Sequence, residues 1–307
     1  MSTATPDAPA GLRTRRIRPL EQGTLLILGS AAALSVLITI GIVFTLVEEG
    51  WGFWSKASPV DFLTGRDWFP VSDEFGVLPL LSGSVMIALL AGIFAVPVGL
   101  GSAIYLSEYA SPRARGLIKP VLELLAGMPT IVLGFFALDT INPVLQRLGL
   151  VDKNQIYSYL AAGLVVGLLI VPFIASLSED ALRAVPRSMR EGAYGLGATR
   201  RVVATKIIVP AALSGIMASI VLALSRAVGE TMAVTLAAGT QPNLTWNPFD
   251  QGQTITSVIV AVSKGEASRG TTIYQSIFAI GLVLFVVTLV INIIAVQIVR
   301  RFRTVYN

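Results

Sequence analysis

Two side chains of opposite charge lie four residues apart inside an apolar stretch. Residues 222–234 read LALSRAVGETMAV, in which Arg226 and Glu230 are the charged positions. On a helix, positions i and i+4 share a face. A charge at the centre of a membrane helix costs about 2.5–3.5 kcal/mol, whereas each large aliphatic residue contributes only about 0.3–0.6 kcal/mol. The pattern therefore predicts that this helix packs inside a bundle, with its charged face toward a polar seam.

Two roles for this pair are compatible with the sequence. In the first, Arg226 and Glu230 form an intrahelical salt bridge that merely neutralises itself. In the second, Arg226 is a fixed cation in the path of an anion, because a guanidinium matches oxyanion oxygens bidentately, and Glu230 holds Arg226 while the path is empty. We favour the second role, since an ionisable residue inside a membrane is a functional candidate by default. Ser225, Gly229 and Ala233, at four-residue spacing, would let another backbone approach this helix closely.

The composition indicates an integral membrane protein. Of 307 residues, 54% are hydrophobic and only 13% are charged, and the mean hydropathy is +0.74. The chain contains no Cys and no His, which excludes disulfides and metal or haem sites built on those ligands, and removes the commonest general base at neutral pH. No G-x-x-x-x-G-K-[ST] pattern occurs, so the sequence carries no Walker loop that would cradle ATP phosphates. We therefore expect no cofactor, no metal site and no catalytic activity in this chain.

Apolar runs long enough to cross a hydrocarbon core of about 30 Å define six predicted transmembrane helices. They cover residues 24–47, 80–107, 117–138, 158–178, 207–237 and 272–299. The second and the fifth run exceed the usual length, so we expect each to be tilted or broken, or to extend beyond the membrane. Pro97, Pro129 and Pro172 lie inside predicted spans, and we interpret them as kinks in a packed bundle. The expected fold class is an all-α integral membrane protein.

Lys and Arg residues determine the predicted orientation, because basic loops stay on the cytoplasmic side. Placing both termini in the cytoplasm puts sixteen of the 23 basic residues there. Residues 1–19 are then a disordered, basic cytoplasmic segment that precedes a membrane domain over 20–307. Residues 48–79 and 239–271 are outer segments, and 253–263 is predicted to form a short apolar helix. Since the basicity follows the topology, we expect a lipid bilayer, and no nucleic acid, as a partner.

The segment between the fourth and fifth predicted spans has the pattern of a helix–turn–helix. Ser178 or Asp180 can cap a first helix with an apolar stripe. Gly195 and Gly197 are placed to end that helix, and Thr199 is placed to cap a second. The pattern predicts a pair of short helices across the inner face of the membrane.

Seven residues of this segment occur at the spacing of a sequence motif. They are Glu191, Gly192, Ala193, Gly197, Ile207, Val209 and Pro210. The spacing resembles the EAA motif of ABC-importer permeases, which reads E-A-A, three residues, G, nine residues, I-x-L-P. Here Gly192 replaces the first Ala and Val209 replaces the Leu. The resemblance implies a type I ABC-importer permease fold with six transmembrane helices. In that family the loop, here 179–210, is a coupling helix that docks into a groove on a cytoplasmic ATPase. The coupling roles would then fall to Glu191, Gly192, Ala193, Gly197, Ile207 and Pro210.

Four further stretches strengthen the resemblance. They are FLTG…WFP…FGVLPLLSGS (62–84), VPVGLGSAIYLSEYA (96–110), ELLAGMP (123–129) and SRAVGETMAV (225–234). Together they look like the PstC-type permeases of phosphate importers, whereas sulfate and molybdate permeases share the loop motif and are less similar elsewhere. The resemblance implies a permease of the bacterial inner membrane that works with a PstA-type second permease, two copies of a PstB-type ATPase and a PstS-type phosphate-binding protein. The anion that passes Arg226 would then be phosphate.

A secondary transporter and a membrane enzyme are the alternatives from other classes. The first would show inverted repeats and paired broken helices, and the second needs a constellation of nucleophile, base or metal ligands. The sequence shows neither clearly. Among the remaining acidic residues, Glu123 is predicted to pair with Lys119 near the inner interface, and Glu108 to make a surface contact beside Arg113 and Arg115.

Overall fold

A computed structural model of the chain describes residues 19–301. Residues 1–18 and 302–307 lie outside the described range, so the disorder predicted for residues 1–19 concerns almost only residues that are not described. The chain divides into two units, Met1–Thr45 and Leu46–Asn307. Within the described residues every regular element is helical except one pair of two-residue strands, which confirms the predicted all-α class.

The elements follow one another along the chain with these bounds: α1 Pro19–Trp54, α2 Pro59–Thr64, β1 Trp68–Phe69, β2 Glu74–Phe75, α3 Leu78–Ile104, α4 Pro112–Ala126, α5 Thr130–Phe136, α6 Asn142–Arg147, α7 Tyr159–Arg183, α8 Arg187–Gly195, α9 Arg200–Val202, α10 Val209–Ala211, α11 Leu213–Val228, α12 Met232–Ala237, α13 Ile255–Ala261 and α14 Thr272–Arg301. A 3₁₀ turn, Pro70–Ser72, joins the strands, and π-helical segments cover Tyr105–Tyr109, Ala137–Ile141, Val203–Ile208 and Val262–Glu266. The short apolar helix predicted over 253–263 is α13.

Up to six membrane spans are present by length and composition, in agreement with the prediction. Four described helices are long and apolar enough to cross a membrane, namely Gly23–Trp54, Leu78–Tyr109, Tyr159–Arg183 and Thr272–Arg300. Two bent pairs, Pro112–Arg147 and Arg200–Val228, each pass the same test together and supply the third and fifth spans.

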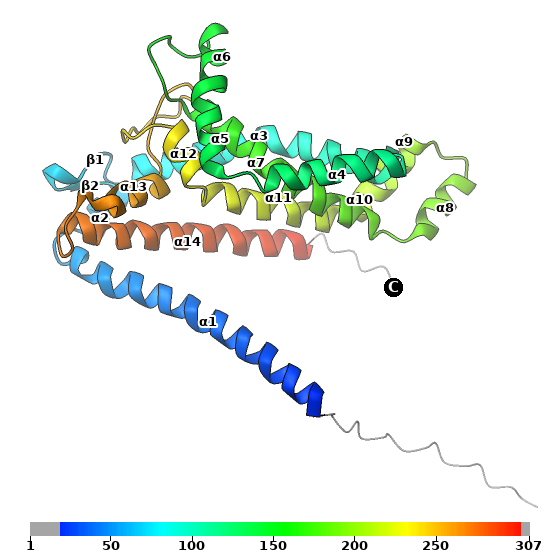
Figure 1. Ribbon diagram of the computed structural model, residues 1–307, viewed down its shortest axis with the longest axis horizontal. Coiled ribbons are helices and arrows are strands. Elements are labelled where there is room, and N and C mark those ends of the chain that lie inside the picture. The colour runs from blue at the N-terminus through cyan, green and yellow to red at the C-terminus, as the bar shows by residue number, and fades with distance from the viewer. Residues whose placement is uncertain (1–18, 302–307) are drawn as a thin grey trace, which may run out of the picture. The chain divides into compact units, whose positions relative to one another are not determined.

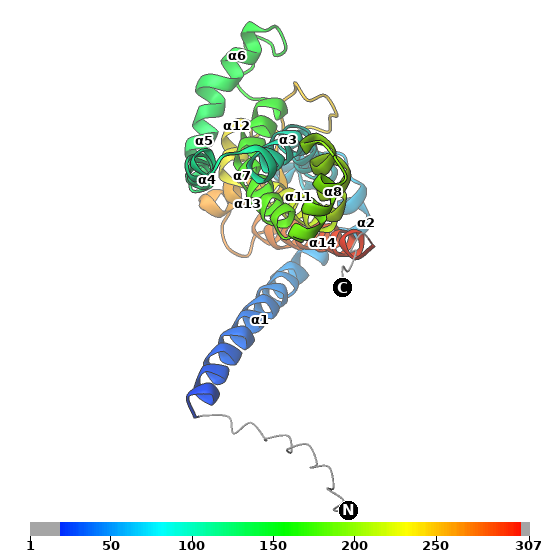
Figure 2. The ribbon, with the colours of Figure 1, turned by 90° about the vertical axis from the view of Figure 1, so that its right-hand side faces the viewer.

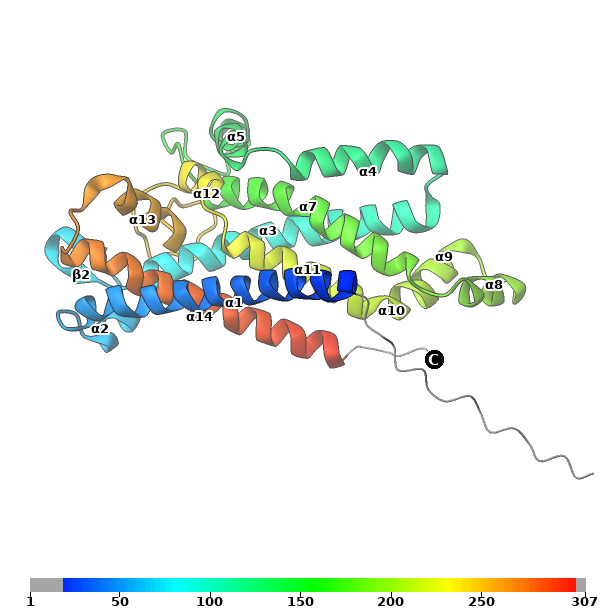
Figure 3. The same ribbon diagram turned by 60° about the horizontal axis from the view of Figure 1, so that its bottom comes forward.

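The third span, predicted over 117–138 with a kink at Pro129, is bent sharply at that proline. Helices α4 and α5 meet at an angle of 91° across the short break that contains Pro129. A proline disfavours the helical conformation of the residue before it, so α4 ends before Pro129 and the chain leaves in a new direction. Figure 3 shows the result: α4 runs alongside α7, and α5 is seen end-on. Pro97 and Pro172, by contrast, lie inside continuous helices α3 and α7.

The fifth predicted span, 207–237, is broken twice. The first break is a 70° bend between α10 and α11. The second follows Val228, where α11 ends, and α12 begins only at Met232. Because Glu230 lies in this second break, it does not share a helix face with Arg226. The small-residue stripe predicted from Ser225 onward is interrupted at the same place.

Helices α3 and α7 form the centre of the second unit and pack through glycine. An added Cβ on Gly163 of α7 would lie 2.5 Å from the Cβ of Leu90 of α3, and one on Gly167 would lie 2.7 Å from the ring of Phe94. On α3, a Cβ on Gly99 would lie 2.8 Å from the Cβ of Ile174. Small residues at four-residue spacing let helix backbones approach closely where no hydrophobic force between helices is available in lipid. Figure 1 shows α3, α7, α11 and α14 lying along one common axis in this unit, with the chain direction of α11 opposite to that of the other three.

The two ends of the bundle carry different structures. At one end α2, the strand pair and α13 pack around an aromatic cluster that contains Phe53, Phe62 and Phe75, with Trp68 paired opposite Phe75 in the strands (Figure 1). At the other end lie α8, α9 and α10, the segment that carries the loop motif. Figure 2 views the bundle from the α8 end.

The close packing of α3 on α7 predicts which glycines tolerate a methyl group. Gly99→Ala and Gly163→Ala should each lower stability by about 1–3 kcal/mol, because overpacking displaces the facing helix. Gly101→Ala is the matched control, since nothing lies within 4 Å of its added Cβ. The midpoint of thermal unfolding of the purified chain in detergent measures the effect. An unchanged midpoint for Gly163→Ala would contradict the packing.

Candidate functional site: an arginine of the fifth span and an exposed short helix

Arg226 lies in the last turn of α11 and has no acidic partner among the described residues. Its Cζ lies 4.7 Å from the ring centroid of Phe173 on α7, a cation–π contact. Among the residues whose side chains the structure describes, it makes no ion pair with Glu230 or with any other carboxylate. The side chain is exposed on the isolated chain. Stacking of the guanidinium on a ring leaves its in-plane N–H donors free, so Arg226 can still bind an anion.

Glu230 belongs to a different local structure. Its side chain is buried, and Oε1 accepts from the backbone N–H of Ala233, in the first turn of α12, at 3.5 Å. Its backbone carbonyl accepts from the hydroxyl of Thr256 on α13 at 2.8 Å. A carboxylate near a helix N-terminus is favourably placed, because the backbone N–H groups there are unpaired. The intrahelical salt bridge considered from the sequence is therefore absent between these two described residues, since Gly229 caps α11 before Glu230 is reached.

Other polar contacts lie along the same helix. The hydroxyl of Ser225 donates to the side-chain oxygen of Asn292 on α14 at 2.9 Å. Nearer the start of α11, Ser219 and Ser178 of α7 share a buried hydrogen bond of 2.6 Å. Helix α11 thus presents hydroxyl groups and one guanidinium rather than a uniformly apolar surface, although Glu230 does not share its face and Arg226 is exposed.

The helical segment that carries the loop motif begins later than predicted. Ser178 and Asp180 do not cap a helix, because α7 continues past both to Arg183. The chain then turns at Ala184–Pro186, and α8 starts at Arg187. Ala181 and Leu182 continue α7 without interruption, so the local capping signal is overridden.

Helix α8 ends as the glycine pattern predicts. Gly197 has a φ of +80°, its N–H bonds to the carbonyl of Tyr194 at 2.9 Å, and the N–H of Ala198 bonds to the carbonyl of Ala193 at 3.1 Å. This pair of bonds is a Schellman motif with glycine at the left-handed position. Thr199 precedes α9 in an extended conformation, although its side chain makes no capping hydrogen bond.

The motif residues divide into an inner and an outer set. Ala193 is buried and Ile207 is partly buried, and both pack in an apolar cluster with Leu182 of α7. Pro210 lies in α10, just before the 70° bend. Glu191 and Gly192 are exposed.

Two further exposed side chains on α8 and its end enlarge the outer set. Tyr194 is 45% exposed and Leu196 is 90% exposed. A large aliphatic side chain left almost fully open at the end of a short helix is an unusual feature of a free surface and is typical of a contact site.

A buried carboxylate that sequence reasoning missed lies between α4 and α7. The side chain of Glu179 is 0% exposed and pairs with Lys119 at 3.0 Å, with Arg115 at 3.3 Å and with Arg183 at 3.6 Å. Lys119 also pairs with Asp180 at 3.2 Å. The sequence signal for this site was the four-residue spacing of Arg115 and Lys119, which places both cations on one face of an amphipathic helix.

The predicted roles of two other acidic residues were wrong. Glu123 is exposed and makes no ion pair with Lys119, which turns to α7 instead; both residues lie in the described range. Glu108 is not a surface residue: its side chain is 6% exposed and pairs with Arg190 of α8 at 3.2 Å. Arg115, expected beside Glu108, instead donates to the carbonyls of Leu106 and Ser107.

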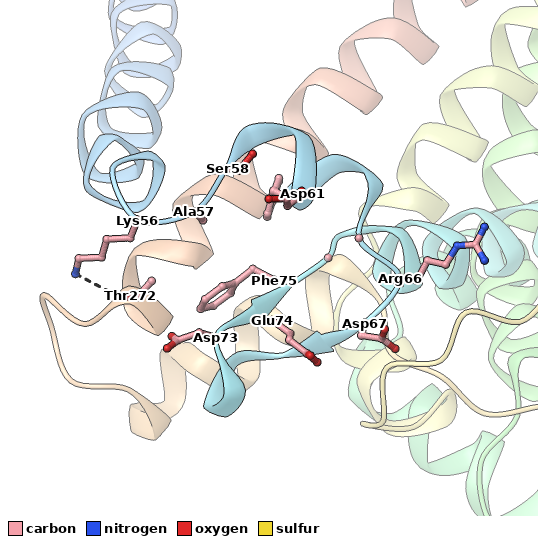
Figure 4. Close-up of a pocket in the computed structure, with 13 residues that line it drawn as sticks. Lys56, Ala57, Ser58, Asp61, Arg66, Asp67, Asp73, Glu74, Phe75 and Thr272 are labelled. Carbon is pink, nitrogen blue, oxygen red and sulfur yellow. Dashed lines mark hydrogen bonds between the residues drawn. The ribbon is translucent and has the colours of Figure 1, made fainter.

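The opposite end of the bundle contains a charged cavity of about 530 Å³, which Figure 4 shows. Its lining includes four carboxylates and two basic side chains: Asp61, Asp67, Asp73, Glu74, Lys56 and Arg66. Lys56 donates to the hydroxyl of Thr272, which ties this segment to the start of α14.

The left-handed turn predicts a specific sensitivity. Gly197→Ala should cost about 1–2 kcal/mol, because an L-residue is strained at positive φ. Gly192→Ala is the matched control: its added Cβ meets nothing within 4 Å, and alanine is the better helix former. Thermal unfolding of the purified chain compares the two. Equal midpoints would mean that the turn does not need glycine.

Comparison with known proteins agrees with this geometry. Residues 95–304 match the family of binding-protein-dependent transport system inner membrane components. The chain is 33% identical to the phosphate transport system permease protein PstC of Mesorhizobium japonicum over 88% of each chain. It is also 33% identical to the probable ABC transporter permease protein YqgH of Bacillus subtilis over 90% of each.

Solved structures share the fold at lower identity. A bacterial ABC transporter involved in import of the acidic polysaccharide alginate matches with a TM-score of 0.57 and 18% identity, over 92% of this chain and 99% of that one. The MetNI methionine ABC transporter matches with a TM-score of 0.56 and 19% identity, over 74% and 96%. The type I ABC-importer permease fold and the resemblance to PstC-type permeases are thereby confirmed. The chain belongs to the family of binding-protein-dependent transport system inner membrane components.

Proposed function

We propose that this chain is the transmembrane permease subunit of an ABC importer that moves inorganic phosphate into the cell, while a separate subunit hydrolyses ATP. The observation that carries the proposal is the guanidinium of Arg226, which lies at a break in the fifth span without a carboxylate partner in the described part of the chain. The name carried by the PstC relatives supports phosphate as the anion.

The surroundings of Arg226 suit an anion that must bind and then leave. A guanidinium binds phosphate oxygens through two parallel hydrogen bonds, and the interaction is stronger away from bulk water. Phe173 orients the group without occupying its donors. Glu230, which points into α12, leaves the positive charge available. A single cation, rather than several, binds the anion weakly enough for the anion to be released.

The two ends of the bundle suit different partners. The exposed residues of α8 and the turn after it, with Glu191, Tyr194 and Leu196 among them, would enter a groove on a PstB-type ATPase, of which two copies are expected. A PstS-type phosphate-binding protein would dock at the opposite end, where charged residues line the cavity of Figure 4. A PstA-type second permease would complete the path, because Arg226 is open on the single chain. In this arrangement both termini and α8 are cytoplasmic, as the distribution of Lys and Arg favours.

Reconstitution tests the substrate directly. The chain is assembled in vesicles with its PstA-, PstB- and PstS-type partners, and ATP-dependent uptake is measured for phosphate, sulfate and molybdate in parallel. We expect uptake of phosphate that stops without ATP. Uptake of sulfate or molybdate in preference to phosphate would replace the proposal with that of a permease for another oxyanion. Uptake without ATP would point to a secondary transporter.

Substitutions at Arg226 test the site. Arg226→Gln should lower phosphate uptake by about tenfold or more, because losing a charge-assisted hydrogen bond costs about 1.5–3 kcal/mol. Arg226→Lys keeps the charge but loses the planar fork, so partial uptake is expected. Arg147→Gln, in the exposed part of α6, is the control. Complex yield is measured beside uptake for every variant.

The double variant separates transport from a salt-bridge brace. Arg226→Gln with Glu230→Gln leaves no unpaired charge at these two positions, and we expect it to assemble normally and still fail to import phosphate. If the double variant recovers uptake, Arg226 and Glu230 act as a brace and Arg226 leaves the proposed path.

A further inference from the structure

We propose that Arg190 is the positioning residue through which α8 is held to the cytoplasmic ends of both α3 and α7, so that a displacement of α8 moves the two spans together. This inference rests on the proposed function, because α8 is where an ATPase subunit would act. It concerns how this chain transmits that displacement.

The guanidinium of Arg190 makes the hydrogen bonds that join α8 to these two helix ends. Nη1 of Arg190 donates to the carbonyl of Val185 at 2.7 Å, and Nη2 donates to the carbonyl of Leu182 at 2.7 Å. The last carbonyls of a helix have no partner within the helix, and a cation there is also favoured by the helix dipole. Arg190 therefore caps the C-terminal end of α7 from the following helix.

The same guanidinium reaches the end of the second span. Nη2 lies 3.2 Å from Oε1 of Glu108, in the π-helical segment that continues α3. The hydroxyl of Ser107 also donates to this Oε1, at 2.9 Å. Both charged side chains are largely shielded, at 19% and 6% exposure, so water competes little for the pair. A fork with several donors in one plane suits this task better than an ammonium group.

The end of α3 is held from the other side as well. Arg115 of α4 binds the carbonyls of Leu106 and Ser107 and pairs with the buried Glu179 of α7. A continuous polar network thus joins α8 to the ends of three spans: α3, α4 and α7. In this network Arg190 is the member that belongs to α8.

Apolar contacts alone would not give this coupling. Met189 and Ala193 of α8 pack in the cluster around Leu182, but such contacts are non-directional and permit sliding. The covalent link from α7 to α8 is the short turn Ala184–Pro186. This turn limits the distance between the two helices but does not define the orientation of α8. Directed hydrogen bonds to two separate helix ends define that orientation.

The first experiment measures position in the full-length chain alone. The chain has no cysteine of its own, so Ser111→Cys and Ser188→Cys introduce two spin-label sites, one beside the end of α3 and one on α8. Pulsed EPR should give a narrow distance distribution, which Arg190→Gln broadens and Arg113→Gln, an exposed arginine on α4, leaves unchanged. A distribution that stays narrow in Arg190→Gln would overturn the proposal.

The second experiment measures coupling in the reconstituted complex. Arg190→Gln should lower the phosphate imported per ATP hydrolysed by about fivefold or more, while ATP hydrolysis itself continues. Arg190→Lys and Glu108→Gln should each retain part of the ratio, because each keeps some of the contacts, and Arg113→Gln should match wild type. An unchanged ratio in Arg190→Gln would refute the role.

The two experiments distinguish failure of the proposed function from failure of this inference. If the proposed function is wrong, the wild-type complex does not take up phosphate. The EPR result in the chain alone does not depend on the substrate and tests the role of Arg190 separately. If Arg190→Gln fails to assemble with the ATPase, a broadened distance distribution in the chain alone still supports the role, and a narrow one rejects it.

Discussion

A charge inside an apolar helix bundle needs an opposite charge, hydrogen-bond donors or a polar path, and this constraint accounts for where several charged side chains of the described residues lie. Glu179 is fully buried and has three cations around it, and Glu108 is shielded and paired with Arg190. Removing such charges from water costs several kcal/mol each, so close partners are needed. Arg226 contacts the ring of Phe173 and has no carboxylate partner among the described side chains. Because that contact is too weak to replace hydration, we propose that Arg226 faces an aqueous or subunit-lined path beside α11.

Helix breaks decide which charges meet. Had the fifth span continued as one helix, Arg226 and Glu230 would have faced the same side and neutralised each other. The end of α11 at Val228 and the new start at Met232 place Glu230 against the N-terminal turn of α12, with its carbonyl held by Thr256. A few unwound residues thereby convert a potential salt bridge into an available cation. In membrane interiors such irregular backbone is tolerated where protein surrounds it.

At the α8 end of the bundle, one side of α8 is held by neighbouring helices and the other side is exposed. The Schellman turn at Gly197 closes α8 on one side, and Arg190 ties it to α7 and α3 on the other. Ala193 faces the apolar cluster while Leu196 remains open. This arrangement, with α8 held on its inner side and exposed on its outer side, is the one that the proposed coupling role requires.

Local chemistry was readable in the amino-acid sequence, whereas the pairing of charges was not. Apolar runs predicted six spans, because the cost of burying polar groups in lipid leaves few alternatives, and Gly197 was correctly placed at a helix end, because few residues tolerate positive φ. Lys119, however, meets Glu179 across 60 residues rather than Glu123 one turn away, and Arg190 meets Glu108 across 82. Periodicity assigns a side chain to a helix face, but the packing of α4, α7 and α8 determines which charge stands opposite, and it also determines where the broken spans turn.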